Sequence, residues 1–260
     1  MVIAPTLRPP QPPDDEIEYP TGDGEPMAET DLLWWQTANS IFALKSYFAN
    51  DPDTYVSGDN FIYYVEGDNQ TRVSPDCYVV FGVGNALRDC YKVWKEQRKM
   101  PDVVFEFTSK STQQEDTGKK FQIYERVMAV PEYFLFDPTG DYLNPILQGY
   151  RLVNGRYIPL VIQDNRLYSE QLKLELVIRG ETMRFFNPTM GKWLLTLEEL
   201  KDKAKIKTHS AEAEALARVQ ADQHAEVEAQ RAEVETQARL QAEARIAQLM
   251  AELERLRRHE

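Results

Sequence analysis

Hydrophobic and polar positions along the first half of the chain alternate between helical and strand spacing. A helix is predicted over residues 30–49, with Thr30 or Asp31 as its cap and an apolar stripe at Leu33, Ile41, Leu44 and Phe48. Aromatic and β-branched residues predict strands over 60–66 and 77–83, and residues 84–100 are expected to form a loop or short helix. The nearly continuous apolar run at 103–107 is typical of a strand buried on both faces.

The second half of the globular region continues the same alternation. A helix is predicted over 113–129, because Phe121, Tyr124 and Met128 share one face, and Pro131 ends it before a strand at 133–136. Asn154-Gly155 between 148–153 and 156–162 is a hairpin signal. Further strands are expected at 172–178 and 183–186, followed by a turn at 188–193. The order helix, three strands, helix, strand predicts an α/β domain with a mixed central sheet.

Composition changes at both ends of the chain and sets the expected domain boundaries. Residues 1–28 are rich in Pro, Asp, Glu and Gly, which predicts a flexible N-terminal arm. Residues 210–260 consist largely of Ala, Glu, Gln and Arg without Gly or Pro, which predicts a long helix. We therefore expect an arm at 1–28, a globular domain at 29–195 and a helical tail at 196–260.

The tail contains a short pattern that favours self-association. Apolar residues alternate by three and four positions near its end, at Ile246, Leu249, Leu253 and Leu256. This spacing predicts a coiled-coil seam and a homodimer formed through the C-terminal helix. The alternative is an exposed single helix held by ion pairs between neighbouring turns.

Charge, histidine and cysteine content exclude several classes of protein. A formal net charge of −12 argues against a protein that coats nucleic acid, but not against an enzyme that meets phosphates through a local basic site and a metal. The basic residues within 84–100 are such a candidate, or simply a solvated face. Histidine catalysis is excluded from the globular region because all three His lie in the tail, and two cysteines make no zinc or disulfide framework. Without a signal peptide or an 18-residue apolar run, no membrane contact and a cytoplasmic location are expected.

Two acidic residues are the strongest candidates for chemistry. Glu106 lies inside the buried strand at 103–107, where a carboxylate costs several kcal/mol unless it is paired or bound to a metal. Asp76 opens the preceding strand, and carboxylates on neighbouring strands can hold a hard cation such as Mg²⁺ beside a phosphate. Asp102 shares the face of Glu106 and either assists it or marks the boundary of the strand.

Six blocks in order resemble the Uma-type restriction endonuclease family of the PD-(D/E)xK nuclease superfamily. The resemblance covers about residues 25–190 and rests on Pro75-Asp76, Tyr91 to Glu96, Pro101 to Glu106, Thr108 to Thr112, Asp116 with Lys120 and Tyr124, and Glu132 to Pro138. It implies a restriction-endonuclease-like core in the order α-β-β-β-α-β. It also implies a metal-dependent endonuclease that hydrolyses DNA phosphodiester bonds with Mg²⁺ or Mn²⁺.

The same resemblance implies roles for individual residues. Asp76 and Glu106 match the acidic metal ligands of the motif, while Thr108 stands where the superfamily has its lysine. The family resembles a variant whose lysine comes from the following helix, which favours Lys120 over the nearer Lys110.

An acid from the region of the first helix is also implied, and Glu29 is preferred to Glu25. Asp116 is interpreted as a helix N-terminal charge rather than a ligand. Members often carry a His early in the first helix, where this chain has Leu32 to Trp35. That departure keeps open an alternative function: a catalytically degenerate nuclease-fold scaffold or regulatory module, dimerised by the tail.

Overall fold

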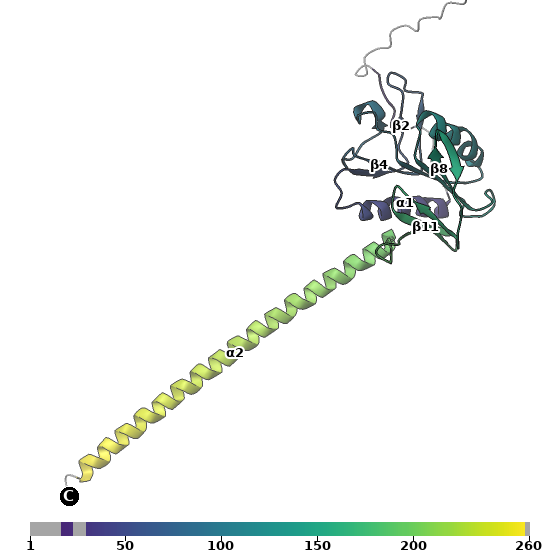
Figure 1. Ribbon diagram of the computed structural model, residues 1–260. Coiled ribbons are helices and arrows are strands. Elements are labelled where there is room, and N and C mark those ends of the chain that lie inside the picture. The colour runs from purple at the N-terminus through teal and green to yellow at the C-terminus, as the bar shows by residue number, and fades with distance from the viewer. Residues whose placement is uncertain (1–16, 23–29, 258–260) are drawn as a thin grey trace, which may run out of the picture. The chain divides into compact units, whose positions relative to one another are not determined.

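The chain divides into two units, residues 1–199 and 200–260, of which the computed structural model describes residues 17–22 and 30–257 (Figure 1). The second unit is a single uninterrupted helix, α2 (Leu197–Arg257), which begins in the last residues of the first unit. The predicted long C-terminal helix is therefore confirmed. Within the described residues, none of the helices has the length and apolar character needed to cross a membrane.

A six-stranded mixed sheet forms the centre of the first unit. Its order is β1 (Thr54–Ser57), β4 (Cys77–Phe81), β6 (Val103–Phe107), β7 (Glu132–Phe136), β8 (Leu147–Val153) and β9 (Arg156–Pro159). Only the central pair β6 and β7 is parallel, and the other neighbours are antiparallel. A parallel pair needs a crossover connection, and the helical residues 113–127 supply it. Together with α1 (Asp31–Tyr47), this gives the predicted order α-β-β-β-α-β.

Each face of the central sheet is covered by a different layer. One face packs against α1 and a second sheet, made of β10 (Arg166–Ser169), β11 (Leu174–Arg179), β12 (Thr182–Asn187) and β13 (Lys192–Trp193). In Figure 1, α1 lies between β4 and β11. The other face packs against residues 113–127 and a small sheet of β3 (Arg72–Val73), β2 (Ile62–Tyr63) and β5 (Tyr91–Lys92). Both faces of β6 are therefore removed from water.

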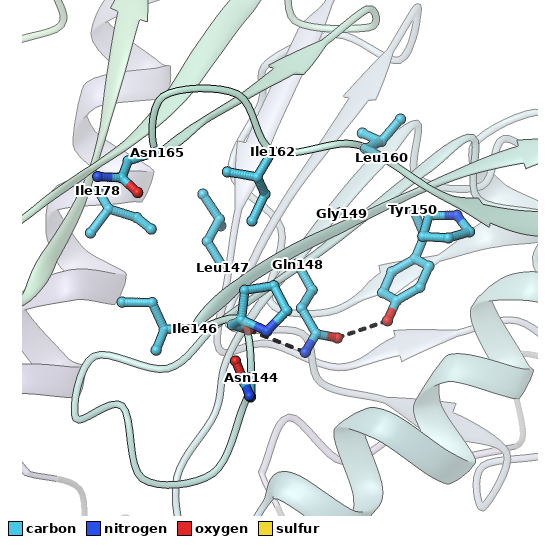
Figure 2. Close-up of a pocket in the computed structure, with 12 residues that line it drawn as sticks. Asn144, Ile146, Leu147, Gln148, Gly149, Tyr150, Leu160, Ile162, Asn165 and Ile178 are labelled. Carbon is cyan, nitrogen blue, oxygen red and sulfur yellow. Dashed lines mark hydrogen bonds between the residues drawn. The ribbon is translucent and has the colours of Figure 1, made fainter.

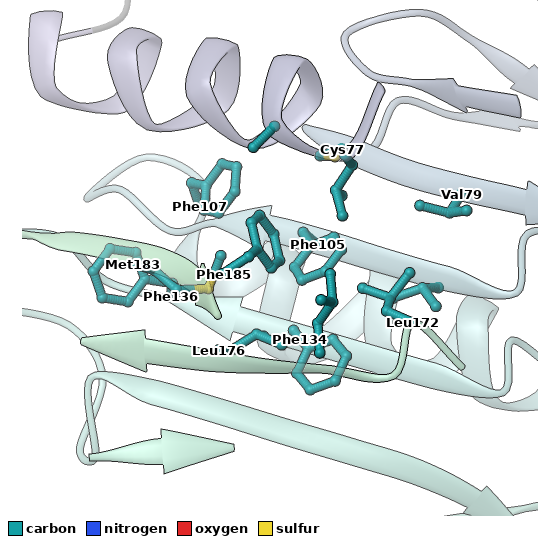
Figure 3. Packing of buried hydrophobic residues seen from close by; sticks show 14 of the residues in the cluster. Cys77, Val79, Phe105, Phe107, Phe134, Phe136, Leu172, Leu176, Met183 and Phe185 are labelled. Carbon is teal, nitrogen blue, oxygen red and sulfur yellow. The ribbon is translucent and has the colours of Figure 1, made fainter. Parts of the chain in front are cut away.

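Aromatic rings fix the orientation of β6 within these layers. Phe105 stacks on Phe134 of β7 with ring centroids 5.2 Å apart, and the ring of Phe185 meets it edge-on at 5.6 Å (Figure 3). Because side chains alternate along a strand, Phe105 and Phe107 face the α1 side, and Glu106 faces the crossover segment. Residues 113–127 must therefore satisfy the buried carboxylate of Glu106.

The crossover segment winds into wider helical turns than those of the α-helix predicted for it. Two π-helical stretches occupy most of it, η3 (Glu115–Lys120) and η4 (Ile123–Val127). The N–H of Met128 donates to the carbonyl of Ile123, five residues back, at 2.9 Å. Single-sequence spacing does not distinguish the two helix types, because apolar positions three and four apart fit both. π-helical turns are rare and occur often at functional sites.

Other departures from the predicted elements involve short strands. The strand predicted at 60–66 is reduced to β2, and the region 84–100 contains β5 and the 3₁₀ helix η2 (Val93–Lys95). β1, β10 and β13 carry too few residues to show a period in the sequence, and β13 ends the turn predicted at 188–193. The hairpin between β8 and β9 is confirmed, with positive φ at both Asn154 and Gly155.

The described part of the N-terminal segment packs on the domain. The ring of Tyr19 lies 5.0 Å from that of Tyr63 and 5.3 Å from that of Trp94. The hydroxyl of Tyr63 donates to the carbonyl of Pro20 at 2.6 Å, and the Gly67 N–H donates to the Tyr19 hydroxyl at 2.9 Å. Residues 17–22 are thus held by aromatic and hydrogen-bonding contacts, in contrast to the flexible arm predicted from their composition.

Asp137, at the end of β7, organises the loop that follows. Its buried carboxylate accepts five hydrogen bonds, from the N–H groups of Thr139, Gly140, Tyr142 and Leu143 and the Thr139 hydroxyl. Burial alone would raise the pKa of Asp137, but these donors stabilise the carboxylate and bring the pKa below its ordinary value of 3.8. A lowered acid pKa means that ionised Asp137 stabilises the fold.

We expect Asp137→Asn to lower the free energy of unfolding by about 1–3 kcal/mol at pH 7, because a donor then faces several N–H groups. The stabilisation by Asp137 is complete above pH 3.8 and disappears as the pH falls through the lowered pKa. Denaturation followed at pH 7 and below pH 3.8 should therefore show the difference from wild type narrowing in acid. Asp141→Asn, an exposed acid in the same loop, is the control; equal effects of the two variants would contradict the prediction.

Candidate active site

Glu106 is completely buried and both of its carboxylate oxygens have a partner on the crossover segment. The ammonium of Lys120 lies 2.8 Å from Oε2, and the Tyr124 hydroxyl donates to Oε1 at 2.7 Å. Lys120 is 12% exposed, so this ion pair is largely shielded from water. The carboxylate is thereby fixed in one orientation, with further lone pairs available on each oxygen.

A second buried acid shares the same lysine. Asp116 is 1% exposed, and its Oδ1 lies 3.1 Å from the Lys120 ammonium. Neither of its carboxylate oxygens accepts a hydrogen bond from any residue in the described part of the chain. The main chain around it is fixed, since the Tyr133 hydroxyl donates to its carbonyl at 3.0 Å. Lys120 therefore bridges two carboxylates that approach it from a strand and from its own helical segment.

Asp76 is held beside Glu106 by the backbone. It precedes β4, and its Oδ2 accepts a hydrogen bond from the N–H of Phe107, the residue after Glu106, at 2.5 Å. The main chain of Gly58 lies so close that a Cβ there would meet the Asp76 carbonyl oxygen at 2.0 Å. A side chain at Gly58 would therefore displace the backbone that carries Asp76.

The charges of this cluster do not balance. Burial, and then the charge of Glu106, raise the pKa of Asp76 well above its ordinary value, although Lys120 and the Phe107 N–H oppose the shift. Burial raises the pKa of Glu106 to about 7 in spite of Lys120. Burial alone would lower the pKa of Lys120, but the charges of Glu106, Asp116 and Asp76 raise it. Lys120 therefore stays protonated, and three acids surround one permanent cation.

Other buried acids of the domain are satisfied in a different way. Glu132 accepts hydrogen bonds from two backbone N–H groups, the Ser169 hydroxyl and the Arg151 guanidinium. Asp137 accepts five, and Glu125 accepts one from the Tyr157 N–H besides its contacts with arginines. These carboxylates hold loops and strands in place through hydrogen bonds. Among the described residues, the buried side-chain oxygens without a hydrogen-bond partner belong to Asp116 and Thr108, which makes the cluster around Glu106 the candidate site.

The structure thus brings together Asp76, Glu106 and Lys120 of the residues selected from the sequence. Lys110 is exposed in the turn before the crossover segment and takes no part in the ion pairs of the cluster. Asp102 accepts a hydrogen bond from the N–H of Phe81 at 2.8 Å, as expected for a residue at the boundary of the strand. Glu29 and Glu25 lie outside the described residues.

Sequence spacing assigns other roles to two members of the cluster. It predicts a helix N-terminal charge at Asp116, which is buried and paired with Lys120. It predicts an apolar face that includes Tyr124, whose hydroxyl donates to Glu106. The spacing of Asp116, Lys120 and Tyr124 at four-residue intervals was the available signal, because residues four apart share a face of a helix.

The carboxylates fit a hard divalent cation of the magnesium type. Within the described residues, no group of three or more His, Cys, Asp or Glu side chains is arranged to hold a metal ion. Mg²⁺ does not require one, since it commonly binds through one or two carboxylates and completes its shell with water and substrate phosphate. Asp76 and Glu106 could supply two such ligands, and a bound cation would relieve the repulsion between their carboxylates.

A separate hollow of about 740 Å³ lies beside β8 and is mainly apolar (Figure 2). Leu147, Ile162 and Ile178 line it, and no charged side chain is among its lining residues. Gln148 at its rim donates to the carbonyl of Pro145 and accepts from the Tyr150 hydroxyl. The hollow has none of the groups needed for phosphate chemistry, so the cluster around Glu106 remains the candidate active site.

Comparison with known proteins shows the family of the chain. The family model Uma2, described as "Putative restriction endonuclease", matches residues 5–181, a range that contains the whole cluster. The chain belongs to the Uma2 family. A crystal structure from Anabaena variabilis ATCC 29413, described as "a putative nuclease belonging to DUF820", is similar at 12% identity and a TM-score of 0.43. The similarity covers 58% of this chain and 81% of that one. No curated protein matched the chain.

We expect Lys120→Met to lower the free energy of unfolding by about 3–5 kcal/mol, because it leaves buried carboxylates without their cation. The adjacent, exposed Lys119→Met should change it by less than about 0.5 kcal/mol. Adding Asp116→Asn to Lys120→Met should restore part of the loss, since one uncompensated charge is removed. Urea denaturation followed by tryptophan fluorescence measures this, because all four Trp lie in the first unit. Equal stability of the two lysine variants would show that the bridge does not hold the charge cluster.

Proposed function

We propose that this member of the Uma2 family is a metal-dependent endonuclease that hydrolyses phosphodiester bonds of DNA. The observation that carries the proposal is the cluster at β6, where Asp76 and Glu106 meet one protonated lysine in a buried setting. Excess buried carboxylate is costly for stability and is a property of sites that bind a cation or act on substrate. Membership of the family supports the same class of reaction.

Asp76 and Glu106 would hold Mg²⁺ or Mn²⁺. When bound, such an ion polarises a phosphoryl oxygen and lowers the pKa of a coordinated water. Asp76 is suited to this role because, within the described residues, its carboxylate accepts a hydrogen bond from the Phe107 N–H at Oδ2, which leaves Oδ1 for a ligand. Glu106 is oriented by Tyr124 and Lys120, so its remaining lone pairs have fixed directions.

Lys120 acts in this proposal as a fixed cation rather than as a base. The surrounding acids keep its ammonium protonated, so it cannot accept a proton from water. A preorganised positive charge can instead stabilise the negative charge that develops on the phosphate oxygens in the transition state. Thr108, on the same face of the chain as Glu106, occupies the usual place of this lysine and has a buried hydroxyl without a hydrogen-bond partner in the described residues.

Nicking of supercoiled plasmid in Mg²⁺ or Mn²⁺ tests the function. We expect Asp76→Asn and Glu106→Gln to abolish cleavage, and calorimetry should show weaker divalent-ion binding for both. Lys120→Met should lower the cleavage rate about 10²–10³-fold while retaining metal binding, and Lys110→Ala should have a smaller effect. Lys119→Met and Glu115→Gln, exposed neighbours on the same segment, are the matched controls.

Moving the lysine to position 108 separates the effect of its charge on the cleavage rate from its effect on folding. Thr108→Lys in the Lys120→Met protein returns the ammonium to the face of Glu106 and should recover part of the rate. Wild-type cleavage by Lys120→Met would contradict the role of Lys120. Absence of cleavage and of divalent-ion binding by the wild type would contradict the proposed function and favour a degenerate scaffold.

We infer that the chain forms a homodimer through the end of α2. Ile246 and Leu249 are 57% and 46% exposed in one chain, and their spacing fits a seam between two helices. Burying these side chains against a second copy would remove apolar surface from water.

Sedimentation should show a lower mass per particle, after allowing for truncation, when residues 205–260 are deleted. Ile246→Lys/Leu249→Lys should also dissociate the dimer, because it places charge in the seam. Ala247→Lys/Ala251→Lys adds the same charge to other positions of the helix and should leave the dimer intact. A monomeric wild type, or a deletion that remains associated, would overturn the inference.

A further inference from the structure

A lysine that reaches the site from another element needs something to fix it. A lysine two residues after Glu106 would be oriented by the strand itself, whereas Lys120 projects from the crossover segment on a flexible four-carbon stem. Its ammonium nevertheless lies 2.8 Å from Glu106 Oε2. Glu106 alone does not suffice to position the ammonium, because its charge is also needed at the metal in the proposed function.

Asp116 has the properties of a dedicated partner for this lysine. It is 1% exposed, lies 3.1 Å from the Lys120 ammonium, and accepts no hydrogen bond at its carboxylate from the described residues. Buried Asp137 and Glu132 receive several donors and hold loops in place, but Asp116 does neither. Its charge is therefore directed at Lys120 and serves no visible structural purpose.

The position of Asp116 is fixed by its own main chain. Its N–H donates to the Thr112 carbonyl at 2.9 Å, and its carbonyl accepts from the buried Tyr133 hydroxyl at 3.0 Å. Tyr133 belongs to β7, the strand beside β6. The acid is thus anchored to the central sheet at its backbone, while its side chain is committed to the lysine.

We propose that Asp116 is the positioning residue for Lys120: it holds the ammonium beside Glu106 and so replaces the orientation that a lysine at position 108 would receive from the strand. This inference rests on the proposed function. Asp116 acts through Lys120 and touches neither metal nor substrate. Two carboxylates within 3.1 Å of one ammonium confine it in a way that a single ion pair does not.

Asp116→Asn tests the proposal with little change of shape. We expect the cleavage rate at saturating DNA and metal to fall about 10-fold or more, since a misplacement of about 1 Å can cost up to 10² in rate. Calorimetric affinity for Mg²⁺ should stay within twofold, because the ligands Asp76 and Glu106 are retained. Glu115→Gln removes the same charge from the adjacent exposed position and should leave both values unchanged.

Combination with Lys120→Met distinguishes positioning from a general structural effect. If Asp116 acts only through the lysine, Asp116→Asn in the Lys120→Met protein should cause no further loss of rate. Additive losses would mean that Asp116 acts on the site by another route and would overturn the proposal. The double variant is also expected to fold, because one uncompensated buried charge is removed with the cation.

A readout independent of cleavage keeps the test valid if the chain proves inactive. In protein labelled with ¹⁵N-lysine, the Lys120 ammonium should give a slowly exchanging signal, assigned by its absence in Lys120→Met. Asp116→Asn should broaden or remove that signal, and Glu115→Gln should preserve it. An unchanged signal together with a wild-type rate in Asp116→Asn would refute the positioning role. If the wild type does not cut DNA, a broadened or lost signal in Asp116→Asn would still support the bridge, and only the nuclease function would be refuted.

Discussion

Burial of Glu106 in a strand covered on both faces is the constraint on which the rest of the site depends. Phe105 and Phe107 commit one face of β6 to the core beneath α1, so the carboxylate can face only the crossover segment. That segment must then place a cation and a hydroxyl within hydrogen-bond distance of the carboxylate, and Lys120 and Tyr124 supply them. The same packing that makes the strand stable therefore dictates which residues can meet the acid.

The crossover segment has two roles: it links the parallel strands β6 and β7, and its Lys120 pairs with Glu106 of β6. Its π-helical turns place Asp116, Lys120 and Tyr124 toward the sheet. There the Tyr133 hydroxyl donates to the carbonyl of Asp116, and the Tyr133 ring packs against the ring of Tyr124. Such turns cost stability in isolation and persist where packing compensates. Here the compensation comes from the aromatic cluster that covers this face of the sheet.

Sequence patterns predicted the elements that carry long apolar runs or strong turn signals. The strand at Glu106, the first helix and the Asn154-Gly155 hairpin were all recognisable for that reason. Two-residue strands and π-helical turns were not, because neither leaves a period in the sequence. Glu106 was found because a carboxylate in an apolar run is anomalous. Asp116 was missed because an acid in the first turn of a helix is ordinary, and only the fold shows that this one is buried.

A protein with a net charge of −12 must meet a polyanion through local rather than overall attraction. The cluster of three acids and one lysine would not attract DNA by itself, because its acids outnumber its lysine. In the proposed enzyme, metal and phosphate are therefore linked: the cation offsets the buried carboxylates, and only then is the site electrostatically suited to a phosphodiester. In that proposal, acids engaged with the ion would neutralise the ammonium of Lys120 less fully, and its charge would be available to the substrate.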